Sequence, residues 1–291
     1  MRDLRKVDTV VFKGGGIAGL GEGGAWETVK AELDRQGATV TIFGGTSAGA
    51  ILALLCCLGV PLRETMESTP WAKFMPNRWG ILQDIWAALT TGAYSDLTFA
   101  EGWIRARIDE GGLYPDVTFA ELLRHRNVSL KVVATNEQNM RPVLFSAETT
   151  PGVKVSRAVL ASMAIPGVWP SVDIGGVPHC DGGVWANLPL RLVAGHLDAE
   201  RVIGFAIDSP GAGDLAPYRR NGIRRARRLL QALLNGQQIH QPSHLYPGRV
   251  VTVPRPSWAH ATAFDLSKKR QALLWHLGVT AAGEWMRGEK S

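Results

Sequence analysis

A serine flanked by glycines lies between an expected strand and a strongly apolar run, and this feature constrains the fold most. The pentapeptide 45–49, Gly-Thr-Ser-Ala-Gly, follows the β-branched and aromatic run 39–43 and leads into the apolar run 48–60. A GxSxG sequence at a strand-to-helix turn lifts the serine hydroxyl clear of the backbone, and small residues at 45 and 49 avoid collisions across that turn. The helix N-terminus also favours developing negative charge. The pattern predicts a nucleophile at Ser47, with a glycine-rich turn and a capping serine as the alternative.

Expected strands alternate with expected helices along most of the chain. Strand-like runs occur at 9–12, 39–43, 129–135, 143–146, 201–207 and 249–253, and helical spacing occurs at 23–33, 48–60, 155–163 and 265–286. This alternation predicts an α/β fold with a mainly parallel central sheet. Residues 61–127 differ, because tryptophans and prolines are scattered among short helical stretches. We expect this segment to form a helical cap or insertion over one end of the sheet.

A second glycine cluster, residues 14–19 with the sequence GGGIAG, directly follows the first expected strand. It fits the GxGxxG pattern of dinucleotide-binding folds, which also requires an acidic residue at the end of the second strand. The nearest acid, Asp34, precedes that strand instead. The second interpretation is a loop whose N–H groups point at an oxyanion, since adjacent parallel strands would place it beside Ser47. We favour this over a nucleotide-binding oxidoreductase.

A serine nucleophile requires a base, and the sequence offers two kinds of candidate. Asp181 is followed by two glycines, which leave a flexible turn on which the acid can approach a neighbouring serine, although Asp-Gly is also typical of a capped turn. An α/β-hydrolase is disfavoured because Ser47 follows only the second expected strand. Several histidines come late enough in the chain but have no distinguishing local setting: His196, His240, His244, His260 and His276. The residues favour Asp181 over the histidines, but they leave the identity of the base open.

Taken in order, the glycine-rich segments resemble the signature of the patatin-like phospholipases. That signature has GGGxxG after the first strand, GxSxG after the second, and Asp-Gly-Gly about 130 residues later. Residues 161–170, ASMAIPGVWP, are similar to the family's A-S-x-A-x-P-x-x-F-x-P segment, and residues 187–189 to its N-x-P. The resemblance covers residues 8–208. One departure is Ala18, where the family usually has Arg or Lys.

The resemblance implies a three-layer α/β/α fold and a Ser–Asp dyad without histidine. It makes Ser47 the nucleophile and Asp181 the general base. It also implies a lipid acyl hydrolase that cleaves carboxylic esters of phospholipids or other acyl esters through an acyl-enzyme intermediate, without a cofactor. A patatin fold that binds lipid without catalysis is the alternative, for which Ala18 is the hint. The remaining implied site residues are the oxyanion-hole glycines Gly14, Gly15 and Gly16 and the supporting motif glycines Gly19, Gly45, Gly49, Gly182 and Gly183.

The implied catalytic domain spans residues 8–208, with the insertion 61–127 inside it, and residues 209–291 form a basic and helical part packed on the same domain. The chain has a net charge of +6, yet residues 215–264 contain eight Arg and no Asp or Glu. Apolar residues recur at helical spacing within 220–235, so these arginines line an amphipathic helix that either faces solvent or contacts anionic membrane. No recognition motif accompanies the patch, so no nucleic-acid partner is expected. The membrane-contact candidates are Arg220, Arg224, Arg225, Arg227 and Arg228.

Metal sites and targeting signals are not predicted. The three cysteines, two of them adjacent, give neither a disulfide framework nor a CxxC site, and the seven histidines show no HExxH spacing. The N-terminus has no apolar stretch of secretory length, and the run 48–60 is too short to cross a bilayer. We therefore expect a cytoplasmic protein, with peripheral membrane contact as an open alternative. The sequence does not address oligomeric state or export without a cleaved signal.

Overall fold

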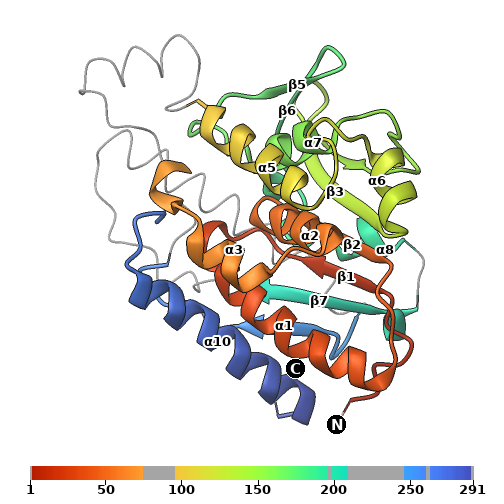
Figure 1. Cartoon of the computed structure of the whole chain (residues 1–291), viewed down its shortest axis with the longest axis vertical. Helices are drawn as coiled ribbons and strands as arrows, with labels where there is room; N and C mark the ends of the chain where they lie inside the picture. The colour runs from red at the N-terminus through yellow and green to blue at the C-terminus, as the bar shows by residue number, and fades with distance from the viewer. Residues whose placement is uncertain (1, 75–95, 196–197, 209–245, 260–262, 290–291) are drawn as a thin grey trace.

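The computed structural model describes residues 2–74, 96–195, 198–208, 246–259 and 263–289. In these residues, helices pack on a central sheet (Figure 1). Its strand order is β5-β6-β3-β2-β1-β7-β8, and β4 pairs with β3 off this path. The α/β class predicted from the sequence is confirmed.

The sheet is mixed, with a parallel centre and antiparallel strands toward one side. The parallel strands are β1 (Thr9–Phe12), β2 (Ile42–Thr46), β3 (Ser129–Asn136), β7 (Val202–Ile207) and β8 (Val250–Val253). The antiparallel strands are β4 (Arg141–Phe145), β5 (Val172–Ile174) and β6 (Val177–Asp181). The mainly parallel sheet is thus confirmed at its centre, whereas the sequence did not predict the β5–β6 hairpin.

Both faces of the central strands are covered. Val10 and Phe12 of β1 belong to the main core, whereas Val11 between them belongs to a smaller cluster on the opposite face. All four residues of β1 are buried, as is usual for parallel strands with helices on both sides. This pattern fits the predicted three-layer arrangement.

Most described helices pack on the main core (Figure 1), and α8 (Leu190–Ala194) packs on the smaller cluster. Those on the main core are α1 (Gly19–Gln36), α2 (Ala48–Leu58), α3 (Leu62–Ser68), α5 (Thr98–Glu110), α6 (Phe119–Arg126), α7 (Val155–Met163) and α10 (Lys268–Arg287). The described residues also form four short 3-10 turns: η1 (Gly16–Ala18), η2 (Trp71–Phe74), η3 (Gly182–Val184) and η4 (Ala199–Arg201).

The bounds of β2 differ from the predicted run 39–43. The strand begins at Ile42 and continues through two glycines to Thr46. Strand propensity disfavours glycine, but β2 pairs with β1 on one side and β3 on the other, so its tertiary setting overrides that preference. A side chain on Gly45 would collide with the carbonyl of Gly49, so glycine is required where α2 folds back over the strand.

The described part of the predicted insertion 61–127 is largely helical and contributes aromatic side chains to the core. The Trp71 ring lies 6.2 Å from that of Trp103, and the Phe74 ring lies 5.6 Å from Trp103 and 6.1 Å from Phe264. Residues 75–95 of this segment and the whole predicted basic helix 220–235 lie outside the described residues. The division into residues 8–208 and 209–291 stays a prediction, although β8 and α10 from the second part join the same sheet and core.

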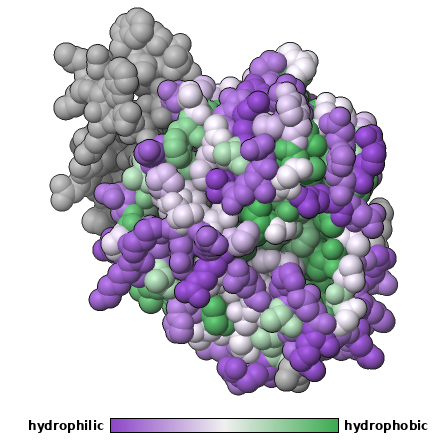
Figure 2. All heavy atoms as spheres, in the orientation of Figure 1, coloured by the Kyte–Doolittle hydropathy of each residue, from purple (hydrophilic) through white to green (hydrophobic). Residues whose placement is uncertain are grey.

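None of the helices in the described part of the chain combines the length and the apolar composition needed to cross a bilayer. The face drawn in Figure 2 is largely hydrophilic, with hydrophobic residues in patches between polar ones.

The long helix α10 lies along α1, and glycines allow the two backbones to approach (Figure 1). A Cβ atom on Gly278 would collide with the carbonyl of Gly21 and would lie 2.8 Å from the nitrogen of Ala25. On the other helix, a Cβ on Gly24 would collide with the carbonyl of Trp275. The crossing therefore depends on glycine on both helices.

We expect Gly278→Ala to lower the free energy of unfolding by about 1–3 kcal/mol, because the added methyl group forces the two helices apart. Gly283→Ala on the same helix is the matched control, since its Cβ would meet only the end of the Arg287 side chain at 3.4 Å. That control should leave stability unchanged or raise it by up to about 1 kcal/mol through helix propensity. Urea unfolding measures both, and equal stabilities for the two variants would contradict the close crossing.

Candidate active site

The glycine cluster and Ser47 lie at the same edge of the sheet. Strands β1 and β2 pair in parallel, with Phe12 opposite Gly45, so the residues that follow each strand emerge side by side. A Cβ on Gly14 would lie 3.2 Å from the Cβ of Ser47, and one on Gly49 would collide with the carbonyl of Phe12. The neighbouring position expected from parallel pairing is confirmed.

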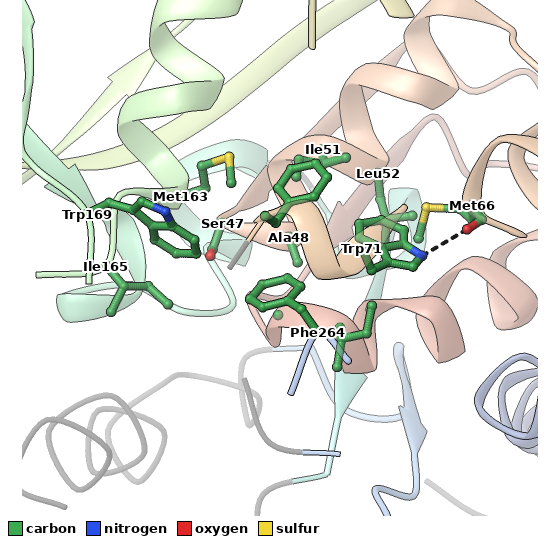
Figure 3. Close-up of a pocket in the computed structure, with 14 residues that line it drawn as sticks. Ser47, Ala48, Ile51, Leu52, Met66, Trp71, Met163, Ile165, Trp169 and Phe264 are labelled. Carbon is green, nitrogen blue, oxygen red and sulfur yellow. Dashed lines mark hydrogen bonds between the residues drawn. The ribbon is translucent and has the colours of Figure 1, made fainter. Parts of the chain in front are cut away.

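Ser47 occupies a strained turn between β2 and α2. Its φ of 56° and ψ of −125° lie in a region that residues with a side chain rarely adopt. The Ser47 carbonyl accepts from the N–H of Ala50 at 2.9 Å, which begins α2. The Ser47 N–H donates to Oγ of Ser162 at 2.8 Å. Ser47 is 7% exposed, and Figure 3 shows its hydroxyl oxygen directed toward the side of the hollow where Trp169 and Ile165 lie.

Asp181 ends β6 and reaches Ser47 across β3. Ala134 of β3 lies opposite Asp181, and the chain then crosses β3 through Gly182. A side chain on Gly182 would collide with the carbonyl of Val133. The Asp181 carboxylate accepts from the N–H of Gly183 at 2.6 Å and also hydrogen-bonds the Ser47 hydroxyl. The structure therefore brings the two candidate catalytic residues into contact, although their chemical roles stay predictions.

The Asp181 carboxylate is held in a buried setting, with 2% of the residue exposed. Burial raises the pKa of Asp181 from 3.8 to about 6, while hydrogen bonds from Ser47 and Gly183 oppose this shift. Asp181 is thus a stronger base than an ordinary aspartate and is still ionised at neutral pH. This combination suits a group that must accept a proton near pH 7.

The first glycine loop offers two N–H groups to the site. The N–H of Gly14 donates to the carbonyl of Asn187 at 2.9 Å, so Gly14 is not available as the oxyanion donor that the sequence predicts. In the part of the chain that the structure describes, the N–H groups of Gly15 and Gly16 donate to no protein acceptor. Gly16 has a φ of 57°, and it lines the same hollow as Ser47. Gly15 and Gly16 remain as predicted oxyanion donors.

Close approaches around this turn leave little room for a side chain at Gly183, whereas Gly19 has space for an ordinary contact. A Cβ on Gly19 would lie 3.4 Å from that of Ala48, and one on Gly183 would lie 2.8 Å from the Asp181 carboxylate and 3.0 Å from Oδ1 of Asn187. Ala18 is buried in the main core beside them. Small residues therefore allow the three motifs to meet.

Two buried titratable residues lie behind the glycine loop and were not predicted from the sequence. The ammonium of Lys13 donates to the carbonyl of Ile207 at 2.6 Å, and the Lys13 N–H donates to the Glu22 carboxyl at 3.2 Å. Burial lowers the pKa of Lys13 to about 8 and raises that of Glu22 well above its ordinary value, and each charge opposes the shift of the other. This pair helps to anchor the strand end from which the loop starts.

An apolar hollow extends from Ser47 over α2. About 500 Å³ of empty space lies within it, open solvent at its mouth included. In the view of Figure 3, Trp71 and Met66 lie at the end away from Ser47, and the Trp71 ring N–H donates to the Met66 carbonyl at 2.9 Å. The hollow is lined by Gly16, Ile17, Gly19, Ser47, Ala48, Ile51, Leu52, Met66, Trp71, Phe74, Met163, Ile165, Trp169 and Phe264. It is suited to an apolar group held next to the Ser47 hydroxyl.

Sequence reasoning missed the contacts that Ser162 and Asn187 make, although both lie in segments that it singled out. Among the histidines proposed as alternative bases, His276 is exposed on α10, and the other four lie outside the described residues. His179 is buried on β6, where its Nδ1 lies 2.8 Å from the carbonyl of Val177. Within the described ranges, no cluster of three or more His, Cys, Asp or Glu is placed to hold a metal ion.

Comparison with known proteins adds to this geometry. A family model described as patatin-like phospholipase matches residues 10–194. The uncharacterized protein YqhO of Bacillus subtilis is 27% identical over 294 residues, which cover 92% of this chain and 94% of YqhO. A probable lipid hydrolase, 463L of Invertebrate iridescent virus 6, is 25% identical over 188 residues, which are 63% of this chain and 62% of 463L.

A solved structure shares the fold. VipD from Legionella pneumophila superposes with a TM-score of 0.63 at 16% sequence identity. The match covers 97% of this chain and 67% of the VipD chain. At this identity the likeness concerns the fold alone.

We expect Asp181→Asn to stabilise the chain above pH 6. Between pH 3.8 and about 6, the folded state binds more protons at Asp181 than the unfolded state, so the free energy of unfolding falls as the pH rises through this window. The pKa shift corresponds to a gain in the free energy of unfolding of about 3 kcal/mol for the variant. The hydrogen bonds that the amide cannot form reduce this gain. Urea unfolding at pH 4.5 and 7.5 should show the larger gain at pH 7.5. Asp173→Asn, at an exposed acid on β5, is the control, and the same pH dependence in both variants would contradict the buried carboxylate.

Proposed function

The chain belongs to the patatin-like phospholipase family, and on this premise we propose that it is a lipid acyl hydrolase that uses Ser47 and Asp181 to cleave carboxylic esters. The observation that carries the proposal is the hydrogen bond between the Ser47 hydroxyl and the buried Asp181 carboxylate, beside the N–H groups of Gly15 and Gly16 and at the wall of an apolar hollow. Nucleophile, base, oxyanion donors and a place for an acyl chain are then all present at one sheet edge.

In the first half of the reaction, Asp181 accepts the proton of the Ser47 hydroxyl while Oγ attacks the carbonyl carbon of the ester. The negative charge that develops on the carbonyl oxygen is stabilised by N–H groups of Gly15 and Gly16, each worth about 3 kcal/mol if it behaves like a typical oxyanion donor. The tetrahedral intermediate expels the alcohol, which takes the proton from Asp181. The acyl group is left on Ser47.

In the second half, a water molecule gives a proton to Asp181 and attacks the acyl carbon. The oxyanion again lies against the glycine loop, and collapse of the intermediate returns the proton from Asp181 to Ser47. The products are the free carboxylic acid and the regenerated enzyme. A base with a pKa of about 6 is suited to both steps, because it is ionised at neutral pH and still holds a transferred proton better than an ordinary aspartate does.

The hollow gives the acyl chain of the substrate its place. Its lining between Ser47 and Trp71 consists of apolar side chains and glycines, so burial of methylene groups there is favourable, by about 0.8 kcal/mol for each one. A polar headgroup would remain at the mouth. This arrangement supports acyl esters with an apolar chain as the substrate class.

We expect Ser47→Ala and Asp181→Asn each to reduce hydrolysis of a p-nitrophenyl ester by about 1,000-fold or more, as is typical for removal of a nucleophile or its base. A fluorophosphonate should label the wild-type chain at Ser47 only and leave Ser47→Ala unlabelled. Wild-type hydrolysis should decline as the pH falls through about 6, where Asp181 becomes protonated. Asp173→Asn, which removes an exposed carboxylate on β5, should keep the wild-type rate.

Equal rates for wild type and both site variants would contradict the proposal and leave lipid binding without catalysis. Full activity in Asp181→Asn alone would assign the base to another group, with the late histidines as the next candidates.

We also expect kcat/KM to rise from p-nitrophenyl acetate to esters with longer acyl chains, because each added methylene is buried in the hollow until its end is reached. Ile51→Asn, which places an amide in the lining, should remove most of this preference. Cys56→Ser, toward the other end of α2 and outside the lining, should retain it. A preference for acetate in the wild type would indicate that the acyl chain lies elsewhere.

A further inference from the structure

Ser162 makes a contact that no part of the proposed reaction uses. It lies near the C-terminal end of α7 and is fully buried. Its Oγ accepts from the N–H of Ser47 at 2.8 Å and donates to the carbonyl of Val133 at 2.6 Å. The single proton of the hydroxyl is therefore committed to Val133, which leaves a lone pair fixed in the direction of the Ser47 backbone.

The Ser47 backbone needs such a partner, because its conformation is strained. A residue with a side chain at φ 56° and ψ −125° is less stable by about 1–3 kcal/mol, and the conformation persists only where the surrounding structure holds it on both sides. The first turn of α2 holds the carbonyl of Ser47, and Ser162 holds its N–H. Without the Ser162 hydroxyl, the N–H of Ser47 loses the hydrogen bond that holds this side of the turn.

The same segment also holds Asp181. The N–H of Asp181 donates to the carbonyl of Ala164 at 2.9 Å, two residues after Ser162. The Val133 carbonyl that receives the Ser162 proton also packs against Gly182, where the chain turns from Asp181 toward Ser47. The backbone N–H groups of both candidate catalytic residues are thus bound by residues 162–164.

We propose that Ser162 is a positioning residue that sets the distance between Ser47 and Asp181, with residues 162–164 acting as a common template for the two backbones. This inference rests on the proposed function, since it concerns the geometry of the same proton transfer. When the hydroxyl is removed, the Ser47 backbone can relax toward an unstrained conformation, and its side chain moves away from the Asp181 carboxylate. A displacement of about 1 Å at a reacting group reduces the rate by about 100-fold.

The test compares Ser162→Ala with Ser156→Ala. Both serines lie on α7 and are buried, at 0% and 1% exposed, but the Ser156 hydroxyl has no hydrogen-bond partner among the described residues. We expect Ser162→Ala to lower kcat for p-nitrophenyl ester hydrolysis by about 10- to 100-fold with KM changed less than about 2-fold, and to slow fluorophosphonate labelling of Ser47 in parallel. Ser156→Ala should match the wild type in all three. The measurements are made well below the thermal unfolding midpoint of every variant.

The pH profile separates positioning from a purely structural role. The hydrogen bond from Ser47 lowers the pKa of Asp181, so weakening that bond raises it, and the low-pH limb of the rate profile should move upward from about 6 in Ser162→Ala only. Burial raises the pKa of Asp181, and the hydrogen bonds from Ser47 and Gly183 lower it. Strand β6 carries two further titratable side chains. Burial raises the pKa of the Cys180 thiol, so it contributes no charge, and the ring of His179 packs against Phe145 with its Nδ1 at 2.8 Å from the carbonyl of Val177.

The inference is overturned if Ser162→Ala lowers only the unfolding temperature and keeps the kcat and pH limb of Ser156→Ala. Where Ser162→Ala does not fold, Ser162→Cys keeps the side-chain shape but replaces the hydroxyl with a thiol, which forms only weak hydrogen bonds. It should show a smaller loss of kcat and a smaller upward shift of the low-pH limb. Wild-type kinetics in a folded Ser162→Cys would overturn it equally. Absence of hydrolysis and labelling in the wild type is a different failure, because it removes the proposed function itself.

Discussion

The parallel pairing of β1 with β2 is the constraint on which the site depends. The segments that follow these two strands therefore leave the sheet side by side. The backbone of the first glycine loop lies directly against the serine turn, because the glycines there have no side chain to separate them. A side chain on Gly14 would meet Ser47, and one on Gly49 would collide with the end of β1. Main-chain N–H groups can approach a reacting atom at Ser47 only because this contact excludes side chains. The paired strands place the glycine loop beside Ser47, and the glycines allow their N–H groups to reach the reacting atom.

Two unfavourable features are concentrated at this edge and held by hydrogen bonds from outside it. Ser47 adopts a strained backbone conformation, and Asp181 is ionised at neutral pH in a buried setting. Each is stabilised by a backbone contact to the end of α7 and by short hydrogen bonds within the turn. The strain at Ser47 and the burial of Asp181 both lower the free energy of unfolding. In return, the site holds a nucleophile next to a carboxylate whose affinity for a proton is raised. The helices packed around the sheet provide the stability that offsets them.

Much of this arrangement could be predicted from the sequence, because glycine spacing, the apolar run after Ser47 and strand–helix alternation are local signals. Asp181 is different. Its approach to Ser47 depends on the antiparallel pairing of β6 with β3 and on a crossing at Gly182. The local Asp-Gly-Gly pattern favoured Asp181 over a histidine but could not decide between them, and the family resemblance made the choice. The contact of the Gly14 N–H with the carbonyl of Asn187 could not be predicted either, because Asn187 comes from a distant loop. Ser162 was visible as part of a motif, but its contact with Ser47 arises from tertiary packing alone.

The central claim is that Ser47, Asp181 and the glycine loop act on one ester carbonyl. The most direct measurement is a crystal structure of the chain after reaction with a fluorophosphonate, whose tetrahedral phosphorus imitates the reacting carbon. The account predicts phosphorus bonded to Ser47 Oγ, its oxygen about 2.7–3.1 Å from the N–H nitrogens of Gly15 and Gly16, and Asp181 beside Oγ. An adduct on another residue, or a phosphoryl oxygen pointing away from the glycine loop, would contradict it.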